Sequence, residues 1–258
     1  MKNRINELFE TKPKNILSVY YPAGFPQLED TLPVLTELQT AGINMVEIGI
    51  PFSDPMADGT VIQNASGQAL HNGISLKKIF AQLESLRPNI HIPVILMGYL
   101  NPIMQYGFER FCQSCVHAGV DGMIIPDLPF GDYLAHYKEI AQAHQLNVIM
   151  LITPETSEDR VRLIDQHTDG FIYMVSSAST TGAQQDFNQS KQDYFERVNR
   201  MGLKNPRLVG FGVSNKQTLD AANAHASGAI VGSKFVQLLE SSTTKKEAVQ
   251  GLFCLLRE

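Results

Sequence analysis

Glu47 is a carboxylate in the middle of an apolar segment, Met45-Val46-Glu47-Ile48-Gly49-Ile50. Side chains of a β-strand point alternately to opposite faces, so Glu47 shares a face with Met45 and Gly49. We expect the branched residues to pack on helices and Glu47 to point inward, where desolvation raises the pKa of its carboxyl group. Such a group is suited to general acid–base catalysis, unless an interior Arg or Lys holds it in a structural ion pair.

A second carboxylate follows in the loop Pro51-Phe52-Ser53-Asp54-Pro55-Met56-Ala57-Asp58-Gly59. Asp54 precedes a proline and is suited to stabilising a turn. Asp58 has two interpretations. It is either the N-cap of the helical segment that begins at Thr60, or a functional side chain that binds a polar hydrogen of a substrate.

Small residues recur at three turns in the second half of the chain. They are Thr180-Thr181-Gly182, Gly210-Phe211-Gly212 and Gly232-Ser233, each after a strand-like segment. Glycine lets backbone N–H groups approach an anion closely, and the helix that begins after Gly232 adds a favourable dipole. Together the three turns predict a phosphate site.

Eight short apolar segments alternate with helical patterns along the chain. The predicted strands span Ile16–Tyr20, Met45–Ile50, Pro93–Met97, Met123–Ile125, Val148–Ile152, Phe171–Val175, Arg207–Val209 and Ala229–Val231. Most are continuously apolar, as in a parallel sheet that helices cover. We therefore predict an α/β fold, a single (β/α)8 TIM barrel of one domain over residues 1–258, with chemistry at the carboxyl ends of the strands. The alternative is a doubly wound open sheet, but the turn at 22–26 lacks its glycine fingerprint.

Glycines and histidines mark the expected helix ends. Ala41-Gly42, Ala118-Gly119 and Ser227-Gly228 each stand just before a predicted strand, which is typical of glycine at the carboxyl end of a helix. Four of the seven histidines fall near helix ends, namely His117, His144, His167 and His225. This position is away from the expected chemistry, and histidine there interacts favourably with the helix dipole.

Composition excludes several classes of protein. The net charge of −5 argues against sequence-independent nucleic-acid binding, which needs a basic surface. The longest apolar stretch, at 92–100, is too short to cross a membrane, and three cysteines fit a reducing compartment, so we expect a cytoplasmic protein. Cys112 and Cys115 have the spacing of half a zinc site, but the sequence offers too few further ligands, and we expect no metal.

Four stretches of this sequence resemble the α subunit of tryptophan synthase, and the resemblance covers nearly the whole chain. The stretches are Val46–Gly59 with Ile62-Gln63, Gly98-Tyr99-Leu100-Asn101-Pro102, Pro126-Asp127-Leu128-Pro129, and Gly210-Phe211-Gly212-Val213-Ser214. The first is highly specific to that family. The family's barrel is preceded by a helical segment, which Asn3 to Phe9 would supply.

The resemblance implies retro-aldol cleavage of indole-3-glycerol phosphate to indole and D-glyceraldehyde 3-phosphate, a step of tryptophan biosynthesis. It assigns the proton transfers at the reacting carbon and hydroxyl mainly to Glu47. It also implies that Asp58 accepts a hydrogen bond from the indole N–H, an interaction that strengthens as positive charge grows on the ring.

The resemblance further assigns residues around these two carboxylates. Tyr173 would border Glu47, and Thr181 would contact Asp58 when its loop closes. The indole slot would be lined by Tyr20, Ile124 and Phe211, and the alternative for each of them is a place in the barrel core. The phosphate would be held by Gly182, Gly212, Gly232 and Ser233. One departure concerns the loop after Gly182, which lacks the arginine that many members place there.

The resemblance also implies a partner. The α chain would dock on a β subunit in an α2β2 heterotetramer and pass indole to it, with 51–59 and Asn101-Pro102 facing the partner. Pyridoxal phosphate would belong to that β subunit, and we expect no cofactor in this chain. Three alternatives stay open: a stand-alone indole-3-glycerol phosphate lyase, a sugar-phosphate isomerase or epimerase on the same scaffold, and a non-catalytic effector subunit.

Overall fold

The protein folds as a closed barrel of parallel strands. The computed structural model describes residues 3–175, 189–210 and 212–257. Within these ranges eight strands pair in chain order, and β1 closes the barrel by pairing with both β2 and β8. The strands are β1 (Ile16–Pro22), β2 (Met45–Gly49), β3 (Val94–Met97), β4 (Gly122–Ile124), β5 (Asn147–Ile152), β6 (Ile172–Val175), β7 (Arg207–Gly210) and β8 (Gly228–Val231). The predicted TIM barrel is confirmed, and the predicted strand ends lie within about two residues of the observed ones.

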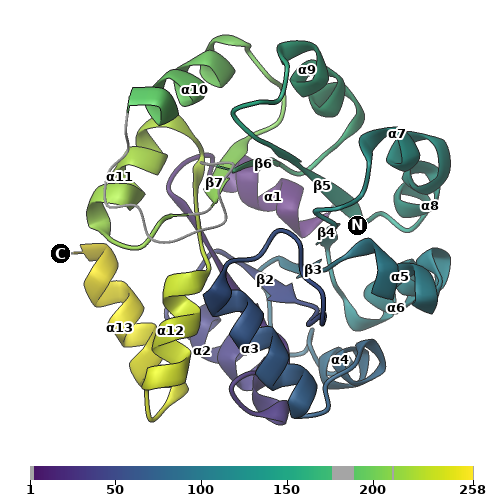
Figure 1. The fold of residues 1–258 in the computed structure, drawn as a ribbon, viewed down its shortest axis with the longest axis vertical. Coiled ribbons are helices and arrows are strands. Elements are labelled where there is room, and N and C mark those ends of the chain that lie inside the picture. Colours follow the sequence, from purple (N-terminus) through teal and green to yellow (C-terminus); the bar gives the residue numbers. More distant parts are fainter. Residues whose placement is uncertain (1–2, 176–188, 211, 258) are drawn as a thin grey trace.

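Helices surround the strands. They are α1 (Arg4–Thr11), α2 (Thr31–Thr40), α3 (Thr60–His71), α4 (Leu76–Leu83), α5 (Leu100–Tyr106), α6 (Phe108–Ala118), α7 (Phe130–Asp132), α8 (Lys138–Ala143), α9 (Glu158–His167), α10 (Gln189–Arg200), α11 (Lys216–His225), α12 (Ser233–Ser241) and α13 (Lys245–Arg257), with the short helices η1 (Leu28–Asp30) and η2 (Tyr133–Tyr137). Figure 1 shows the later helices as a ring around the barrel and α1 near its middle. In the ranges described, no helix combines the length and the apolar character that crossing a membrane requires.

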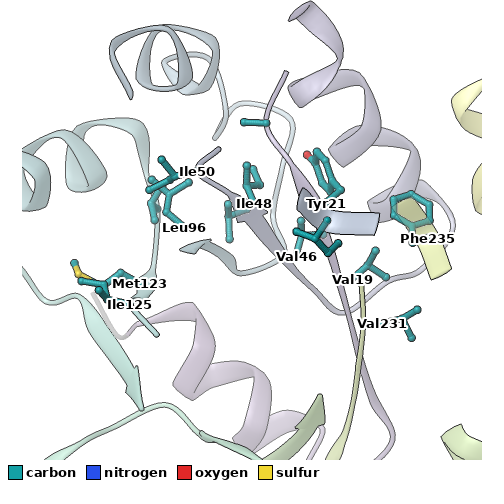
Figure 2. Packing of buried hydrophobic residues seen from close by; sticks show 14 of the residues in the cluster. Val19, Tyr21, Val46, Ile48, Ile50, Leu96, Met123, Ile125, Val231 and Phe235 are labelled. Atoms are coloured by element: carbon teal, nitrogen blue, oxygen red, sulfur yellow. The ribbon is translucent and has the colours of Figure 1, made fainter. Parts of the chain in front are cut away.

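The apolar core has two layers, separated by the strands. Residues of the outer layer point from the strands toward the helices, as Figure 2 shows for Val46 and Ile48 of β2 and for Tyr21 of β1 beside Phe235 of α12. The inner layer fills the barrel and includes Met45, Ile95, Ile124, Ile149, Leu208 and Ile230. The alternation predicted for β2 is therefore confirmed, and it places Glu47 inside the barrel.

Helix α1 closes the amino-terminal end of the barrel. Its apolar side, Ile5 and Phe9, is buried in the inner layer, and the Phe9 ring lies 5.8 Å from that of Phe171, which directly precedes β6. At the start of β4 the Asn3 side chain donates a hydrogen bond to the backbone oxygen of Asp121. With this end closed, the carboxyl ends of the strands are left for chemistry.

Two of the three predicted helix-end glycines are confirmed, and one is wrong. Gly42 and Gly119 follow α2 and α6 with φ values of +91° and +77°. Gly228 instead is the first residue of β8, and α11 ends before it with Ala226 as its C-cap. A Cβ atom at Gly228 would lie 2.0 Å from the backbone oxygen of Ile16, so close pairing with β1 is what requires glycine there.

Candidate active site

Glu47 is a fully buried carboxyl group without a cationic partner among the residues described. It lies on β2 with no exposed surface, and its Oε1 accepts a hydrogen bond from the Ser18 hydroxyl at 3.0 Å. Its Oε2 has no hydrogen-bond partner in the described structure. Burial raises the pKa of Glu47 to about 8, although the Ser18 hydrogen bond acts in the opposite direction. The ion pair considered from the sequence is not seen.

Asp58 follows β2 in the loop above the barrel, and a tyrosine holds its side chain. Its Oδ2 accepts a hydrogen bond from the Tyr99 hydroxyl at 3.0 Å. The N-cap of α3 is Gly59, and this cap makes no side-chain hydrogen bond, so the N-cap interpretation of Asp58 is wrong. Burial raises the pKa of Asp58, and the Tyr99 hydrogen bond partly offsets that effect.

Tyr99 binds Asp58, a contact that the sequence does not indicate, although Tyr99 lies in one of the stretches that carry the family resemblance. It follows β3 and is the N-cap residue of α5. Its hydroxyl accepts a hydrogen bond from the Ala57 N–H at 3.0 Å while it donates to Asp58, so it ties the loop after β2 to the end of β3. Asp127, which follows β4, accepts the Leu100 N–H at 2.8 Å and fixes the start of α5. The sequence signal for such a residue is a tyrosine two positions after a strand.

Tyr20 and Tyr173 bring two phenol groups toward the same carboxylates. The ring of each tyrosine passes close to a glycine of a neighbouring strand, in space that a larger side chain would fill. A Cβ atom would lie 2.3 Å from the Tyr20 hydroxyl at Gly49, and 2.2 Å from the Tyr173 hydroxyl at Gly210. Burial raises the pKa of both phenols, and the nearby charges of Glu47 and Asp58 raise it further. Both hydroxyls therefore remain neutral at physiological pH.

The other predicted residues divide between the described and undescribed parts of the chain. Ile124 is buried in the inner layer at the end of β4. Gly232 and Ser233 begin α12 after β8, and Gly212 follows β7 with a φ of +86°. A Cβ atom at Gly232 would lie 3.5 Å from the Tyr20 ring, so this turn adjoins the site. Thr181, Gly182 and Phe211 lie outside the described residues.

The structure contains no candidate metal cluster in the ranges that it describes. There, no group of three or more His, Cys, Asp or Glu side chains could hold a metal ion. Cys112 and Cys115 are both buried on α6, where burial raises the pKa of each thiol. These cysteines therefore act as small apolar residues.

The fold and the site together define a class of protein. It is a (β/α)8 barrel enzyme with one buried carboxyl group of raised pKa inside the barrel and a second carboxylate at the rim of the barrel. Residues 7–257 match the sequence model of one family, described as the tryptophan synthase alpha chain. The chain belongs to the tryptophan synthase alpha chain family, and it is a lyase of tryptophan biosynthesis.

Individual relatives support this assignment. The chain is 68% identical to the tryptophan synthase alpha chain of Parabacteroides distasonis, over 99% of this chain and 100% of that protein. It is 59% identical to that of Bacteroides fragilis, over 98% and 97%. Among solved structures, the alpha chain from Legionella pneumophila superposes with a TM-score of 0.87 at 34% identity, covering 99% of this chain and 95% of that one.

Proposed function

We propose that this chain cleaves indole-3-glycerol phosphate to indole and D-glyceraldehyde 3-phosphate by a retro-aldol reaction and passes the indole to a β subunit. The observation that carries the proposal is Glu47, a fully buried carboxyl group with one oxygen free of any hydrogen bond to a described residue. The cleavage needs a proton on indole C3 and the removal of a proton from the hydroxyl on the adjacent chain carbon. One carboxyl group can do both in succession.

The raised pKa of Glu47 fits this order of events. With its pKa raised to about 8, Glu47 is mainly protonated at pH 7, so it is ready to act as an acid toward C3. The carboxylate that this leaves then accepts the hydroxyl proton. The bond between C3 and the chain carbon breaks, its electrons return to the ring, and the aldehyde forms.

Asp58 would stabilise the positive charge that protonation at C3 places on the indole ring. Tyr99 holds Oδ2 of Asp58, and we assign Oδ1 to the indole N–H. A carboxylate held in place before the reaction stabilises the developing charge without first reorganising. Tyr173 would border Glu47, and Thr181 would contact Asp58.

The remaining residues would bind the substrate at its two ends. We assign the indole slot to Tyr20, Ile124 and Phe211. We assign the phosphate to Gly182, Gly212, Gly232 and Ser233. Supporting the second assignment, the Gly232 cap of α12 makes no side-chain hydrogen bond, so its first N–H groups point to no capping side chain and suit an anion.

A β subunit would cover the rim of the barrel and complete an α2β2 heterotetramer. Met56 in the loop after β2 has 79% of its surface exposed, and Met104 on α5, near Asn101-Pro102, has 45%. Exposed methionines suit an adaptable protein interface. We assign pyridoxal phosphate to that partner and no cofactor to this chain, which we propose is one cytoplasmic domain over 1–258.

Indole release from indole-3-glycerol phosphate tests the proposal. We expect slow release by the chain alone, strong acceleration by the cognate β subunit, and loss of release in Glu47→Gln with ligand binding retained. Fast release that ignores the partner would indicate a stand-alone lyase. No release under either condition would overturn the proposed reaction, and equal loss of binding and cleavage in Glu47→Gln would overturn the role of Glu47.

A further inference from the structure

Tyr20 carries a hydroxyl group into the site, whereas the family resemblance implies only that its ring lines the indole slot. Tyr20 of β1 is the register partner of Glu47 of β2, and it lies on the inward face with Ser18, whose hydroxyl binds Glu47. The phenol therefore lies beside the acid–base carboxyl group.

Two glycines fix the direction of the Tyr20 ring. A Cβ atom at Gly49 would lie 2.3 Å from the hydroxyl oxygen and 2.7 Å from Cζ, so the outer end of the ring crosses this position. On the other side, a Cβ atom at Gly232 would lie 3.5 Å from Cδ1 of the ring. Since Gly49 lies two residues beyond Glu47 on the same strand face, the hydroxyl points past Glu47 toward the rim that carries Asp58.

This hydroxyl makes no hydrogen bond to any described residue, in contrast to the phenols around it. The Tyr99 hydroxyl donates to Asp58, and the Tyr21 hydroxyl donates to the Thr31 backbone oxygen at 2.6 Å. The Oε2 atom of Glu47 is without a partner in the same part of the structure. The Tyr20 hydroxyl and Oε2 of Glu47 are thus two polar groups without a described partner, and they belong to register partners on adjacent strands. Half-buried tyrosine hydroxyls generally find a hydrogen-bond partner, which here can be a ligand.

The chemistry of the substrate decides which of its groups can pair with this donor; this step rests on the function proposed above. The indole N–H is itself a donor, and the phosphate is assigned to the turns after β7 and β8. The acceptors that remain are the hydroxyl oxygens of the glycerol chain, and the one attached next to the ring must lie within reach of Glu47 for its proton to leave.

We propose that the Tyr20 hydroxyl donates a hydrogen bond to the substrate oxygen from which Glu47 removes the proton. During cleavage this oxygen loses its proton to the Glu47 carboxylate and becomes the aldehyde oxygen, while the electrons of the broken carbon–carbon bond pass to the ring. Negative charge builds on the oxygen before the bond is fully broken. A neutral donor fixed at that point stabilises the transition state more than the bound substrate.

Tyr20→Phe in the complex with the β subunit tests this role, because the change removes only the hydroxyl. We expect kcat for indole-3-glycerol phosphate cleavage to fall about 10²-fold, with KM changed less than about threefold. Indolepropanol phosphate lacks the chain hydroxyls, so its Kd should stay within about twofold of the wild-type value. Tyr21→Phe is the matched control. It removes a hydroxyl from the next residue on the outer face, and we expect it to lower stability but to keep kcat.

The outcomes separate this inference from the proposed function. A Tyr20→Phe complex with kcat within threefold of wild type would overturn the role of the hydroxyl and leave the reaction intact. A parallel loss of indolepropanol phosphate binding and turnover would show that Tyr20 only shapes the slot, which also overturns it. A wild-type complex that releases no indole would instead overturn the proposed function. Unchanged thermal unfolding of Tyr20→Phe confirms that the variant is folded.

Discussion

At the scale of single residues, the site places ionisable groups where solvation cannot stabilise their charge. Glu47 is fully buried and its one hydrogen bond in the described structure comes from a hydroxyl, so burial raises its pKa and favours the neutral form. A buried ion pair would have fixed its charge state and removed it from proton transfer. The same burial that would suit Glu47 to the proposed proton transfers destabilises the fold once the carboxyl group ionises.

The destabilisation caused by ionising the buried Glu47 predicts how the free energy of unfolding depends on pH. The unfolded chain releases the Glu47 proton near the ordinary pKa of 4.5, whereas the folded chain holds it until about 8. Between these values the folded state binds more protons, so its stability falls as pH rises, by up to about 1.4 kcal/mol per pH unit from this group. Glu47→Gln does not titrate, so its free energy of unfolding relative to wild type should increase from pH 5 to pH 8.

Urea denaturation at pH 5, 6.5 and 8 measures this difference. Glu196→Gln is the matched control, because it makes the same substitution at a side chain that is about half exposed on α10. A difference between Glu47→Gln and wild type that is constant over this range would contradict the raised pKa.

At the scale of elements, the short helix α5 connects side chains that follow three strands of the barrel. Asp127 after β4 binds the first N–H of α5, and Tyr99 at the cap of α5 holds Asp58 after β2. Three successive strand ends are thereby linked through one helix of seven residues. Asp58 is positioned by this link rather than by its own loop alone.

Asp127→Ala should therefore impair catalysis from outside the reacting groups. Loss of the acceptor at the start of α5 should cost about 1 kcal/mol of stability, and a shift of Tyr99 should lower kcat by up to about 10²-fold. Asp127→Asn keeps an oxygen that can accept the Leu100 N–H and should recover most of the activity. Steady-state kinetics of both variants with the β subunit checks this, and equal impairment in both would show that the charge of Asp127 matters instead.

The sequence predicts features that depend on local patterns and misses contacts between distant parts of the chain. The alternation of side chains along β2 is sufficient to place Glu47 inside the barrel, because which face a strand residue occupies depends only on its neighbours in the sequence. The hydrogen bond between Tyr99 and Asp58 joins residues 41 positions apart, and no local pattern encodes it. The pattern around Gly228 is misleading for a related reason. Glycine is required there by the approach of the Ile16 backbone on another strand, which only the closed barrel creates.

At the scale of the molecule, one end of the barrel carries the candidate active site and the other end carries contacts that stabilise the fold. The carboxyl ends of the strands carry Glu47 and Asp58, and α1 closes the other end. Asp121, at the start of β4, joins α1 to the barrel there. It is 4% exposed and binds Arg4 at 2.9 Å, Arg87 at 2.5 Å and the Val94 N–H at 2.8 Å. These stabilising contacts therefore lie at the opposite end of the barrel from the proposed active site, as in other barrels of this type.

Asp121→Ala should destabilise the protein strongly and leave its chemistry intact. Removing one partner of a buried ion pair costs about 3–5 kcal/mol, because Arg87 keeps a partly buried charge without its carboxylate. Arg4→Ala removes a side chain that is 37% exposed and should cost no more than about 1 kcal/mol. Denaturant unfolding measures both changes, and kcat of the folded variants with the β subunit at 25 °C should stay within about twofold of wild type. If kcat of Asp121→Ala fell while its stability did not, the closed end of the barrel would have to take part in positioning the site.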